Sequence, residues 1–110
     1  MTTEDSGGVR ILHPEMTQID ALNSEEFKRA LSDGAEGADK IIINLSRIQF
    51  IDSSGLGVLL GIVREMHERG GTICICCARP PVQALFRMVR MSNIVTIHPT
   101  SEDALASFTT

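Results

Sequence analysis

The residues whose types and spacing best suit a chemical role form the run DSSGLG at positions 52–57. This run lies between an apolar stretch and a helical pattern. Asp52 or Ser53 can cap the helix, so Ser54 and Gly55 occupy its first turn, where backbone N–H groups lack intrahelical partners and negative charge is favoured. A phosphate at this point would find unused donors. A phosphoserine at Ser53 would also add a charge of about −2 beside the Asp52 carboxylate and change the surface potential sharply. The segment is suited to a reversible phosphate mark.

A strip poor in side chains continues along the same predicted helix. Gly57 and Gly61 lie four residues apart and, together with Ser54, would let another protein approach the helix closely. A simpler interpretation is that residues 52–54 only cap the helix and that the glycines only let helix and sheet approach. The residue types alone leave both interpretations open.

An enzyme would need a nucleophile with a base, and the sequence assembles none. The histidines are predicted on a polar loop (His13), an exposed helix face (His67) and a strand end (His98). Asp52 stands where a Gly-x-Ser-x-Gly hydrolase requires glycine. We therefore expect no catalytic residues and no enzymatic activity.

Two other phosphate-related classes are disfavoured. A receiver domain phosphorylated on Asp52 would carry an acidic pair after its first strand and a late lysine, but the only lysines are Lys28 and Lys40. The Gly55-Leu56-Gly57 fragment is a weak nucleotide-binding signal without the lysine of a complete phosphate-binding loop. No cofactor is expected.

The three cysteines are clustered. Along a strand, Cys74 and Cys76 would point to one face and Cys77 to the other, so three thiolates could not converge on one metal ion. An odd, clustered count is also unlike a disulfide framework. We expect these cysteines to act as small hydrophobic residues and expect no metal site.

Length and composition limit the remaining possibilities. A chain of 110 residues with 43% hydrophobic and 22% charged residues predicts one folded domain. A net charge of −4, no Trp or Tyr and four Phe disfavour nucleic-acid binding. No apolar stretch approaches the length of a membrane span, and residues 1–8 are polar and do not resemble a secretory signal. We expect a cytoplasmic protein without membrane insertion.

The hydrophobic pattern predicts alternating strands and helices. We expect a flexible lead over residues 1–8, then strands over 9–12, 16–21, 40–45, 72–77 and 94–97. Helices are expected over 24–32, with Asn23 and Glu26 as a capping box, from Ser53 to the Gly70-Gly71 pair, from Pro80 through Val89, and from about residue 100 to 108. This order predicts an α/β fold with a mostly parallel sheet of four to five strands and about four flanking helices.

The pattern also predicts which side chains form the core. We expect joint burial of Ile43, Leu45, Leu59, Leu60, Val63, Ile75, Leu85 and Phe86. On this basis, replacing Leu60 by Ala should cost about 2–5 kcal/mol of stability.

The chain resembles the anti-sigma factor antagonists and the wider STAS domain group. The resemblance rests on residues 42–60, IINLSRIQFIDSSGLGVLL, which look like the family's strand, its Asp-Ser-Ser/Thr-Gly-Leu-Gly phosphorylation loop and its signature helix. The Gly70-Gly71 turn and the Leu85-Phe86 helix extend the similarity, so that residues 9–108 are expected to form one STAS domain.

What the resemblance implies is a bacterial switch protein without catalytic activity. A GHKL-type serine kinase that is also an anti-sigma factor would bind the unphosphorylated form, release its sigma factor and then phosphorylate the antagonist. A PP2C-type phosphatase would remove the phosphate. The alternative within the group is a STAS subunit of a lipid transport complex, a stress-sensing complex or another partner-switching regulator.

The resemblance also assigns site residues. Ser53 matches the family's phosphorylated serine, with Ser54 as its neighbour, and Asp20 matches an aspartate implicated in the kinase contact. Where the family commonly has glycine between its first two strands, this chain has HPEM at positions 13–16. The expected partner-binding residues are Asp20, Asp52, Ser53, Ser54, Gly55, Gly57 and Gly61.

Overall fold

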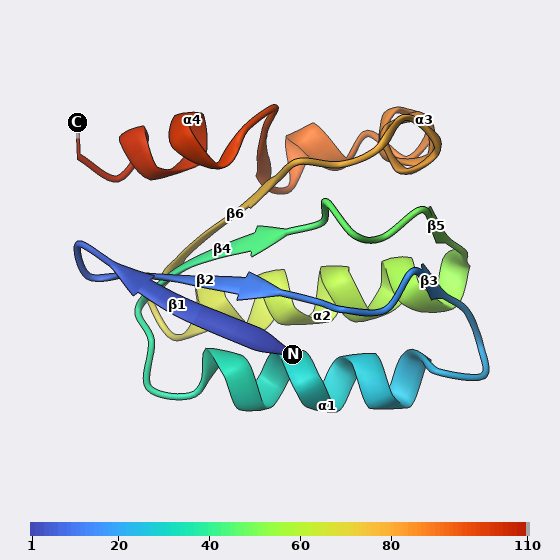
Figure 1. Cartoon of the computed structure of the whole chain (residues 1–110), viewed down its shortest axis with the longest axis horizontal. Coiled ribbons are helices and arrows are strands. Elements are labelled where there is room, and N and C mark those ends of the chain that lie inside the picture. Colours follow the sequence, from blue (N-terminus) through green and yellow to red (C-terminus); the bar gives the residue numbers. More distant parts are fainter. Residues whose placement is uncertain (110) are drawn as a thin grey trace.

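A five-stranded sheet forms the centre of the computed structural model, which describes residues 1–109 (Figure 1). The strands lie in the order β1 (Thr2–Ser6), β2 (Val9–His13), β4 (Lys40–Asn44), β6 (Thr72–Cys76) and β7 (Thr96–His98). The pair β1–β2 is antiparallel, and the other neighbours are parallel. The predicted α/β fold with a mostly parallel sheet is confirmed.

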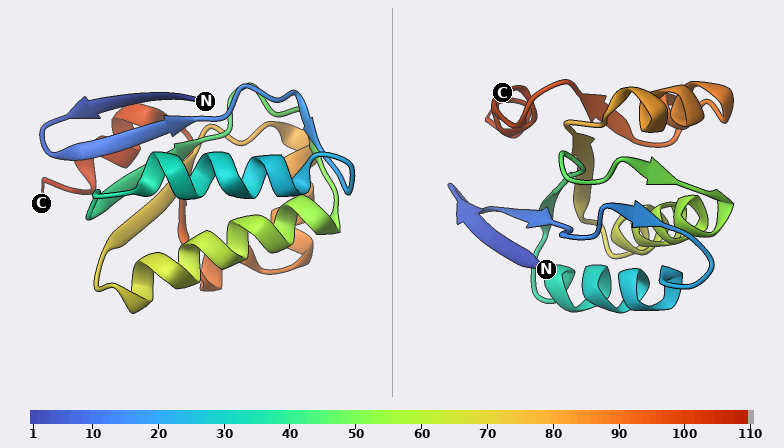
Figure 2. Two further views of the ribbon diagram at one scale, coloured as in Figure 1. Left: turned by 90° about the horizontal axis from the view of Figure 1, so that it is seen from below. Right: turned by 45° about the vertical axis from the view of Figure 1, so that its right-hand side comes forward.

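Four α-helices surround the sheet. They are α1 (Ser24–Ala35), α2 (Ser53–Glu68), α3 (Pro80–Met88) and α4 (Ser101–Ala106), with a short 3-10 helix, η1 (Met91–Asn93), before β7. Helices α1 and α2 lie side by side on one face of the sheet, and α4 covers the other face (Figure 2). A separate two-stranded sheet pairs β3 (Gln18–Ile19) with β5 (Phe50–Ile51).

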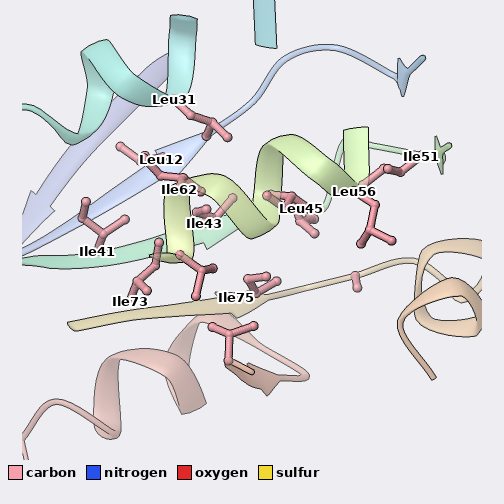
Figure 3. Packing of buried hydrophobic residues seen from close by; sticks show 14 of the residues in the cluster. Leu12, Leu31, Ile41, Ile43, Leu45, Ile51, Leu56, Ile62, Ile73 and Ile75 are labelled. Carbon is pink, nitrogen blue, oxygen red and sulfur yellow. The ribbon is translucent and has the colours of Figure 1, made fainter. Parts of the chain in front are cut away.

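The main hydrophobic core lies between the sheet and the helices α1, α2 and α3 (Figure 3). Six of the eight predicted core residues are buried there: Ile43, Leu45, Leu59, Val63, Ile75 and Phe86. The prediction was wrong for Leu60 and Leu85, which are only half-buried and pack at the margin of the core. Each is next in sequence to a residue on its helix's buried face, and one step along a helix rotates a side chain by about 100°.

A smaller core lies under α4 on the opposite face of the sheet. It contains Val9, Ile11, Ile42, Cys74, Cys76 and Ala104. Alternate residues of β4 enter the two cores, which explains why residues 40–45 form an almost continuous apolar run.

The N-terminal segment is a strand, where a flexible lead over residues 1–8 was expected. All five residues of β1 are exposed, so no hydrophobic pattern marks the strand. Gly7 and Gly8, with φ of 58° and 85°, form the two-residue turn to β2. The glycine that the resemblance placed between the first two strands therefore lies at 7–8 rather than at 13–16.

Helix α1 begins at Ser24 as predicted, but it is longer than predicted and lacks the predicted capping box. It continues through Gly34 to Ala35. Glycine at position 34 lets the helix approach the sheet, because an added Cβ atom there would lie 3.1 Å from the Leu12 Cδ2 atom. No capping box forms, since the Asn23 side-chain oxygen accepts from the backbone N–H of Asp20 instead.

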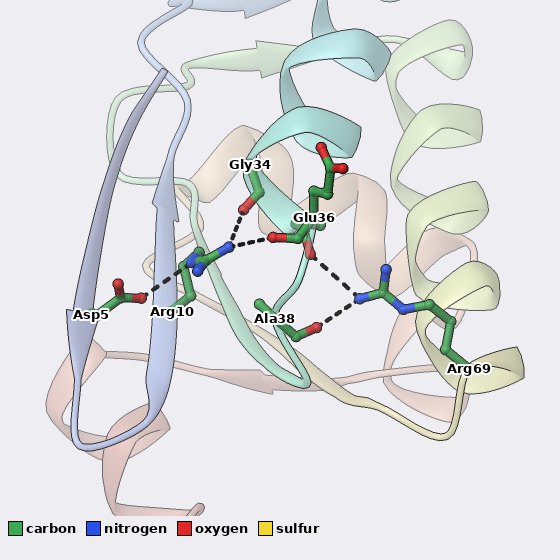
Figure 4. Close-up of polar contacts among 7 residues, drawn as sticks. Asp5, Arg10, Gly34, Glu36, Ala38 and Arg69 are labelled. Carbon is green, nitrogen blue, oxygen red and sulfur yellow. Dashed lines mark hydrogen bonds and ion pairs between the residues drawn. The ribbon is translucent and has the colours of Figure 1, made fainter.

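Two arginines secure the C-terminal end of α1 (Figure 4). Arg10 pairs with Asp5 across the first hairpin and donates to the carbonyl oxygens of Gly34 and Glu36 at 3.2 and 2.7 Å. Arg69, at the end of α2, donates to the carbonyl oxygen of Ala38 at 2.6 Å. Their charges stabilise carbonyl groups that have no intrahelical partner.

The remaining boundaries differ from the predictions by a few residues. The strand expected over 16–21 is reduced to β3. The strand expected over 94–97 is β7, which begins at Thr96 because η1 occupies the residues before Ile94, and Ile94 itself is 44% exposed. Val89 lies just beyond α3 and is exposed, and α4 ends at Ala106. Gly70, with φ of 76°, ends α2 as predicted. None of the helices in residues 1–109 has the length and hydropathy needed to cross a membrane.

Candidate functional site

The DSSGLG segment lies where the chain leaves β5 and enters α2, beyond the carboxyl end of β4 (Figure 1). Strands β3 and β5 are parallel, with Ile19 opposite Ile51, and both isoleucines are buried. The next residue of each strand is an aspartate, and the Asp52 N–H donates to the Ile19 carbonyl oxygen at 3.0 Å. This register brings Asp20 and Asp52 together at the carboxyl end of the small sheet, although 32 positions separate them in the chain.

Asp52 is the N-cap of α2. One of its carboxylate oxygens accepts from the backbone N–H groups of Ser54 and Gly55 at 2.8 and 3.2 Å. The prediction that a phosphate would find unused donors here was therefore wrong for these two groups. The cap fixes the start of α2 and thereby the position of Ser53.

Ser53 is the first residue of α2 and is exposed. Its hydroxyl forms no hydrogen bond with any part of the chain that the structure describes. Ser54 is half-buried. Of the two serines, Ser53 is the one that an approaching enzyme can reach more easily.

Asp20 lies in a turn that its neighbours hold in place. Its carboxylate accepts from the Leu22 N–H at 2.9 Å and from the Gln18 side-chain amide at 3.3 Å. Asn23 closes the turn, because its side chain accepts from the Asp20 N–H and donates to the Gln18 carbonyl oxygen. Asp20 is thus presented at the surface by a fixed loop.

The three glycines of α2 differ in their environments. Gly55 is buried, and a Cβ atom there would lie 2.6 Å from Ile19 Cγ2 and 2.7 Å from Ile51 Cγ2. Its contribution is to let α2 begin directly on β3 and β5, so it does not offer a contact surface. Gly57 and Gly61 face open space, with no atom within 4 Å of an added Cβ.

Gly57 and Gly61 form part of the floor of a groove between α1 and α2. The groove has a volume of about 380 Å³, and its lining includes Ser54, the residue that follows Ser53. Helix α1 supplies the other wall, including Ser24, Glu25 and Lys28. Sequence reasoning missed these α1 residues, because their type is ordinary for an exposed helix face and only the packing of α1 against α2 brings them to the site.

Two exposed apolar side chains near the aspartates were also missed. Leu22 is 96% exposed in the Asp20 turn, and Phe50, which precedes Ile51 in β5, is 53% exposed. A single exposed apolar residue is common on protein surfaces, so neither stands out in the sequence. Their positions on two segments that meet at the site make them candidates for partner contact.

The cysteine prediction was partly wrong. Cys74 and Cys76 are buried under α4, and burial raises the pKa of Cys74 to about 11 and also raises that of Cys76. Cys77 does not point to the opposite face: its φ of 65° turns it out of strand geometry, and its sulfur lies 3.2 Å from that of Cys76. Within residues 1–109 there is no group of three or more potential metal-ligating side chains.

The histidines lie apart from the site. His13 is in β2 rather than on a loop, and its Nε2 lies 2.7 Å from Glu4 Oε1. His67 is exposed on α2 as predicted, and His98 ends β7.

Comparison with known proteins identifies the family. The STAS domain model matches residues 1–104, so the chain belongs to the STAS domain family. Several of the proteins that it resembles are named anti-sigma factor antagonists. The anti-sigma F factor antagonist of Paenibacillus polymyxa is 37% identical over 67 residues, which span 61% of this chain and 57% of that protein.

Solved structures share the fold of this chain. The crystal structure of a Thermotoga maritima protein, provisionally named an anti-sigma factor antagonist, has a TM-score of 0.86 at 26% identity, covering 96% of this chain and 92% of that one. The unphosphorylated form of the antagonist SpoIIAA has a TM-score of 0.74 at 23% identity, covering 97% and 94%. The same fold occurs within the murine anion transporter Slc26a9, at 18% identity, with a TM-score of 0.78 and coverage of 94% of this chain and 18% of that one.

Proposed function

We propose that this chain is a phosphorylation-controlled anti-sigma factor antagonist in the cytoplasm. Unphosphorylated, it binds a GHKL-type serine kinase that is also an anti-sigma factor and displaces the sigma factor. The kinase phosphorylates Ser53, and a PP2C-type phosphatase reverses the modification. The observation that carries the proposal is the exposed Ser53 at the capped start of α2, directly after the Asp52 cap and directly before Ser54, which lines the α1–α2 groove.

Phosphorylation requires little of this chain beyond presenting the hydroxyl. The Ser53 oxygen attacks the γ-phosphorus of ATP, the bond from that phosphorus to the β-phosphate oxygen breaks, and ADP leaves. The hydroxyl proton passes to a base of the kinase. The Asp52 cap holds the Ser53 backbone in place during this transfer, since it fixes the first turn of α2.

The phosphate would act through local charge. The Asp52 carboxylate already accepts from the N–H groups of Ser54 and Gly55, so these donors are not available to neutralise a phosphate on Ser53. The dianion would instead add to the negative charges of Asp52 and Asp20 at one surface. We therefore expect loss of binding by repulsion and bulk, without refolding of the domain.

The proposed contact surface extends from the two aspartates along the groove. Ser54, Gly57 and Gly61 leave space for a partner element between α1 and α2. Leu22 and Phe50 offer apolar contacts beside Asp20 and Asp52. Small central residues flanked by exposed apolar side chains suit a protein partner more than a small polar ligand.

The test is phosphorylation by a GHKL-type anti-sigma factor kinase of the same genome, recovered with the unphosphorylated chain. Wild type incubated with this kinase and ATP should carry one phosphate on Ser53, located by mass spectrometry. Ser53→Ala should bind the kinase without labelling, and Ser53→Asp should lose part of the affinity because a carboxylate has less charge than a phosphate. Ser54→Ala should still be labelled.

A phosphate found on Ser54 would move the site by one residue. If neither serine is modified and Ser53→Asp binds normally, the switch mechanism is wrong for this protein.

The contact surface is tested separately. Gly57→Gln places a side chain in the open groove, so kinase affinity should fall at least tenfold while the fold is unchanged. Arg64→Gln, on an exposed position of α2 outside the groove, is the matched control and should bind as wild type does. Equal affinities for both variants would remove the groove from the interface.

A further inference from the structure

The vicinal cysteines at the end of β6 form a close pair of thiols. Cys76 is the last residue of the strand, and Cys77 follows with a φ of 65°, in the left-handed region that few residues other than glycine adopt. This backbone turn brings the Cys77 sulfur to 3.2 Å from the Cys76 sulfur. Both residues pack against the core under α4.

The two thiols differ in access to solvent. Cys76 is fully buried, whereas Cys77 is half-buried at the surface. Burial is the main cause that raises the pKa of Cys76, and the neighbouring Cys77 thiol is the second cause. A reagent dissolved in water therefore meets Cys77 first, and Cys76 is held in contact behind it.

We propose that Cys76 and Cys77 form a reversible redox site that reacts with hydroperoxides and closes to a vicinal disulfide. In the first step the Cys77 thiolate attacks one peroxide oxygen, the O–O bond breaks, and Cys77 becomes a sulfenic acid while the other oxygen leaves as water or an alcohol after taking up a proton. In the second step the Cys76 sulfur attacks the Cys77 sulfur, the S–O bond breaks and water leaves. Two thiols lose two electrons in total, and the peroxide gains them.

Adjacent residues make such a disulfide easy to reduce. Neighbouring Cα atoms across a trans peptide are about 3.8 Å apart, below the roughly 4.4–6.8 Å that disulfides usually span. The bond would therefore be strained, and strained disulfides are the labile ones. A thiol reductant should reopen the pair readily.

Formation of the disulfide would disturb two backbone hydrogen bonds at the end of β6. The Cys76 carbonyl oxygen accepts from the Leu45 N–H at 3.0 Å, and the Cys77 N–H donates to the His98 carbonyl oxygen at 3.2 Å. Leu45 begins the loop that leads to β5. We expect faster hydrogen exchange at the Leu45 and Cys77 amides after oxidation.

The experiment treats the reduced full chain with hydrogen peroxide and maps the products by mass spectrometry. Wild type should lose two of its three thiols, with a loss of two hydrogens in the peptide that carries Cys76 and Cys77, and dithiothreitol should restore both. Cys74→Ala is the matched control and should react as wild type does. Cys77→Ser should lose thiols at least tenfold more slowly.

Cys76→Ala separates the two steps. Oxidation should then stop at a Cys77 sulfenic acid, which dimedone traps. The proposal is overturned if Cys74 is oxidised as fast as Cys77, if the disulfide joins two chains, or if wild type keeps all its thiols at a peroxide dose that fully oxidises dithiothreitol. All three cysteines lie between Arg69 and Arg79, so fragment-ion sequencing of the wild-type peptide identifies which thiols reacted and decides between these outcomes. The test therefore stands even if a variant folds poorly.

Discussion

At the scale of single residues, Gly55 and Gly57 show how two identical residues in one motif can have different roles. Gly55 lies under the start of α2 against Ile19 and Ile51, and Gly57 faces the open groove. Sequence reasoning treated both as partner-binding positions. Only Gly57 has the exposure that a contact requires.

Replacement of each glycine by alanine tests this difference. Gly55→Ala should lower the free energy of unfolding by about 1–3 kcal/mol, because its Cβ would overlap Ile19 and Ile51. Gly57→Ala is the matched control and should be neutral or stabilising by up to about 1 kcal/mol, since alanine favours the helix. Urea unfolding of both variants measures the difference, and equal effects would contradict the packing described for Gly55.

The buried cysteines predict how stability depends on alkaline pH. Burial raises the pKa of Cys74 from 9.0 to about 11. Between these values the unfolded chain loses this proton and the folded chain keeps it. The free energy of unfolding should therefore fall as pH rises from 9 to 11, by up to about 1.4 kcal/mol per pH unit for each such thiol, and be fully retained below pH 9.

Urea unfolding in reducing buffer between pH 8 and 11 measures this dependence. The chain has no tyrosine to titrate in the same range. Cys74→Ala should show a shallower slope, and Cys74→Ala combined with Cys76→Ala a nearly flat one. An unchanged slope in the double variant would assign the effect to other groups.

At the scale of elements, α2 carries both the site and much of the core. Its first turn is fixed by the Asp52 cap, and its last by Gly70, so the helix has one defined length. One side packs on the sheet through Leu56, Leu59, Val63 and Met66, while Gly57 and Gly61 line the groove. The orientation of this helix therefore decides which residues a partner can reach.

Leu59 and Leu60 test that orientation. Leu59 is fully buried, so Leu59→Ala should cost about 2–5 kcal/mol of unfolding free energy. Leu60 is half-buried, so Leu60→Ala should lower the free energy of unfolding by only about 0.5–1.5 kcal/mol, less than the sequence alone led us to expect. Denaturant unfolding of both variants checks the ranking, and a larger loss for Leu60 would mean that α2 is rotated relative to the structure described.

At the scale of the whole molecule, the sheet has two different edges. Strand β1 covers the edge of β2 but buries none of its own residues, and its links to the rest include the pairs Asp5–Arg10 and Glu4–His13. Strand β7 forms the other edge. Strand β1 therefore protects the β2 backbone and adds no buried side chain to either core.

Deletion of residues 1–6 tests the role of β1. The shortened chain should remain folded, with the same helical circular dichroism and a small decrease in melting temperature, because no buried side chain is removed. The exposed edge of β2 should increase self-association, measured by analytical ultracentrifugation. Unfolding of the shortened chain would show that β1 is part of the cooperative structure to a greater extent than its burial indicates.

The sequence by itself determined the features that depend on local pattern. The helical spacing of Leu56, Leu59, Val63 and Met66, the apolar run at 40–45 and the Gly70-Gly71 stop each reflect periodicities that a backbone geometry imposes. The DSSGLG motif carried the family resemblance for the same reason, because its residues are contiguous.

Only the tertiary structure decided which distant residues meet. The pairing of β3 with β5 brings Asp20 beside Asp52, the packing of α1 on α2 makes the groove, and the left-handed turn at Cys77 brings two thiols together. It also showed that β1 is a strand, since a fully exposed edge strand has no hydrophobic pattern to reveal it. These features arise from contacts between segments far apart in the chain or from single backbone angles, and residue periodicity encodes neither.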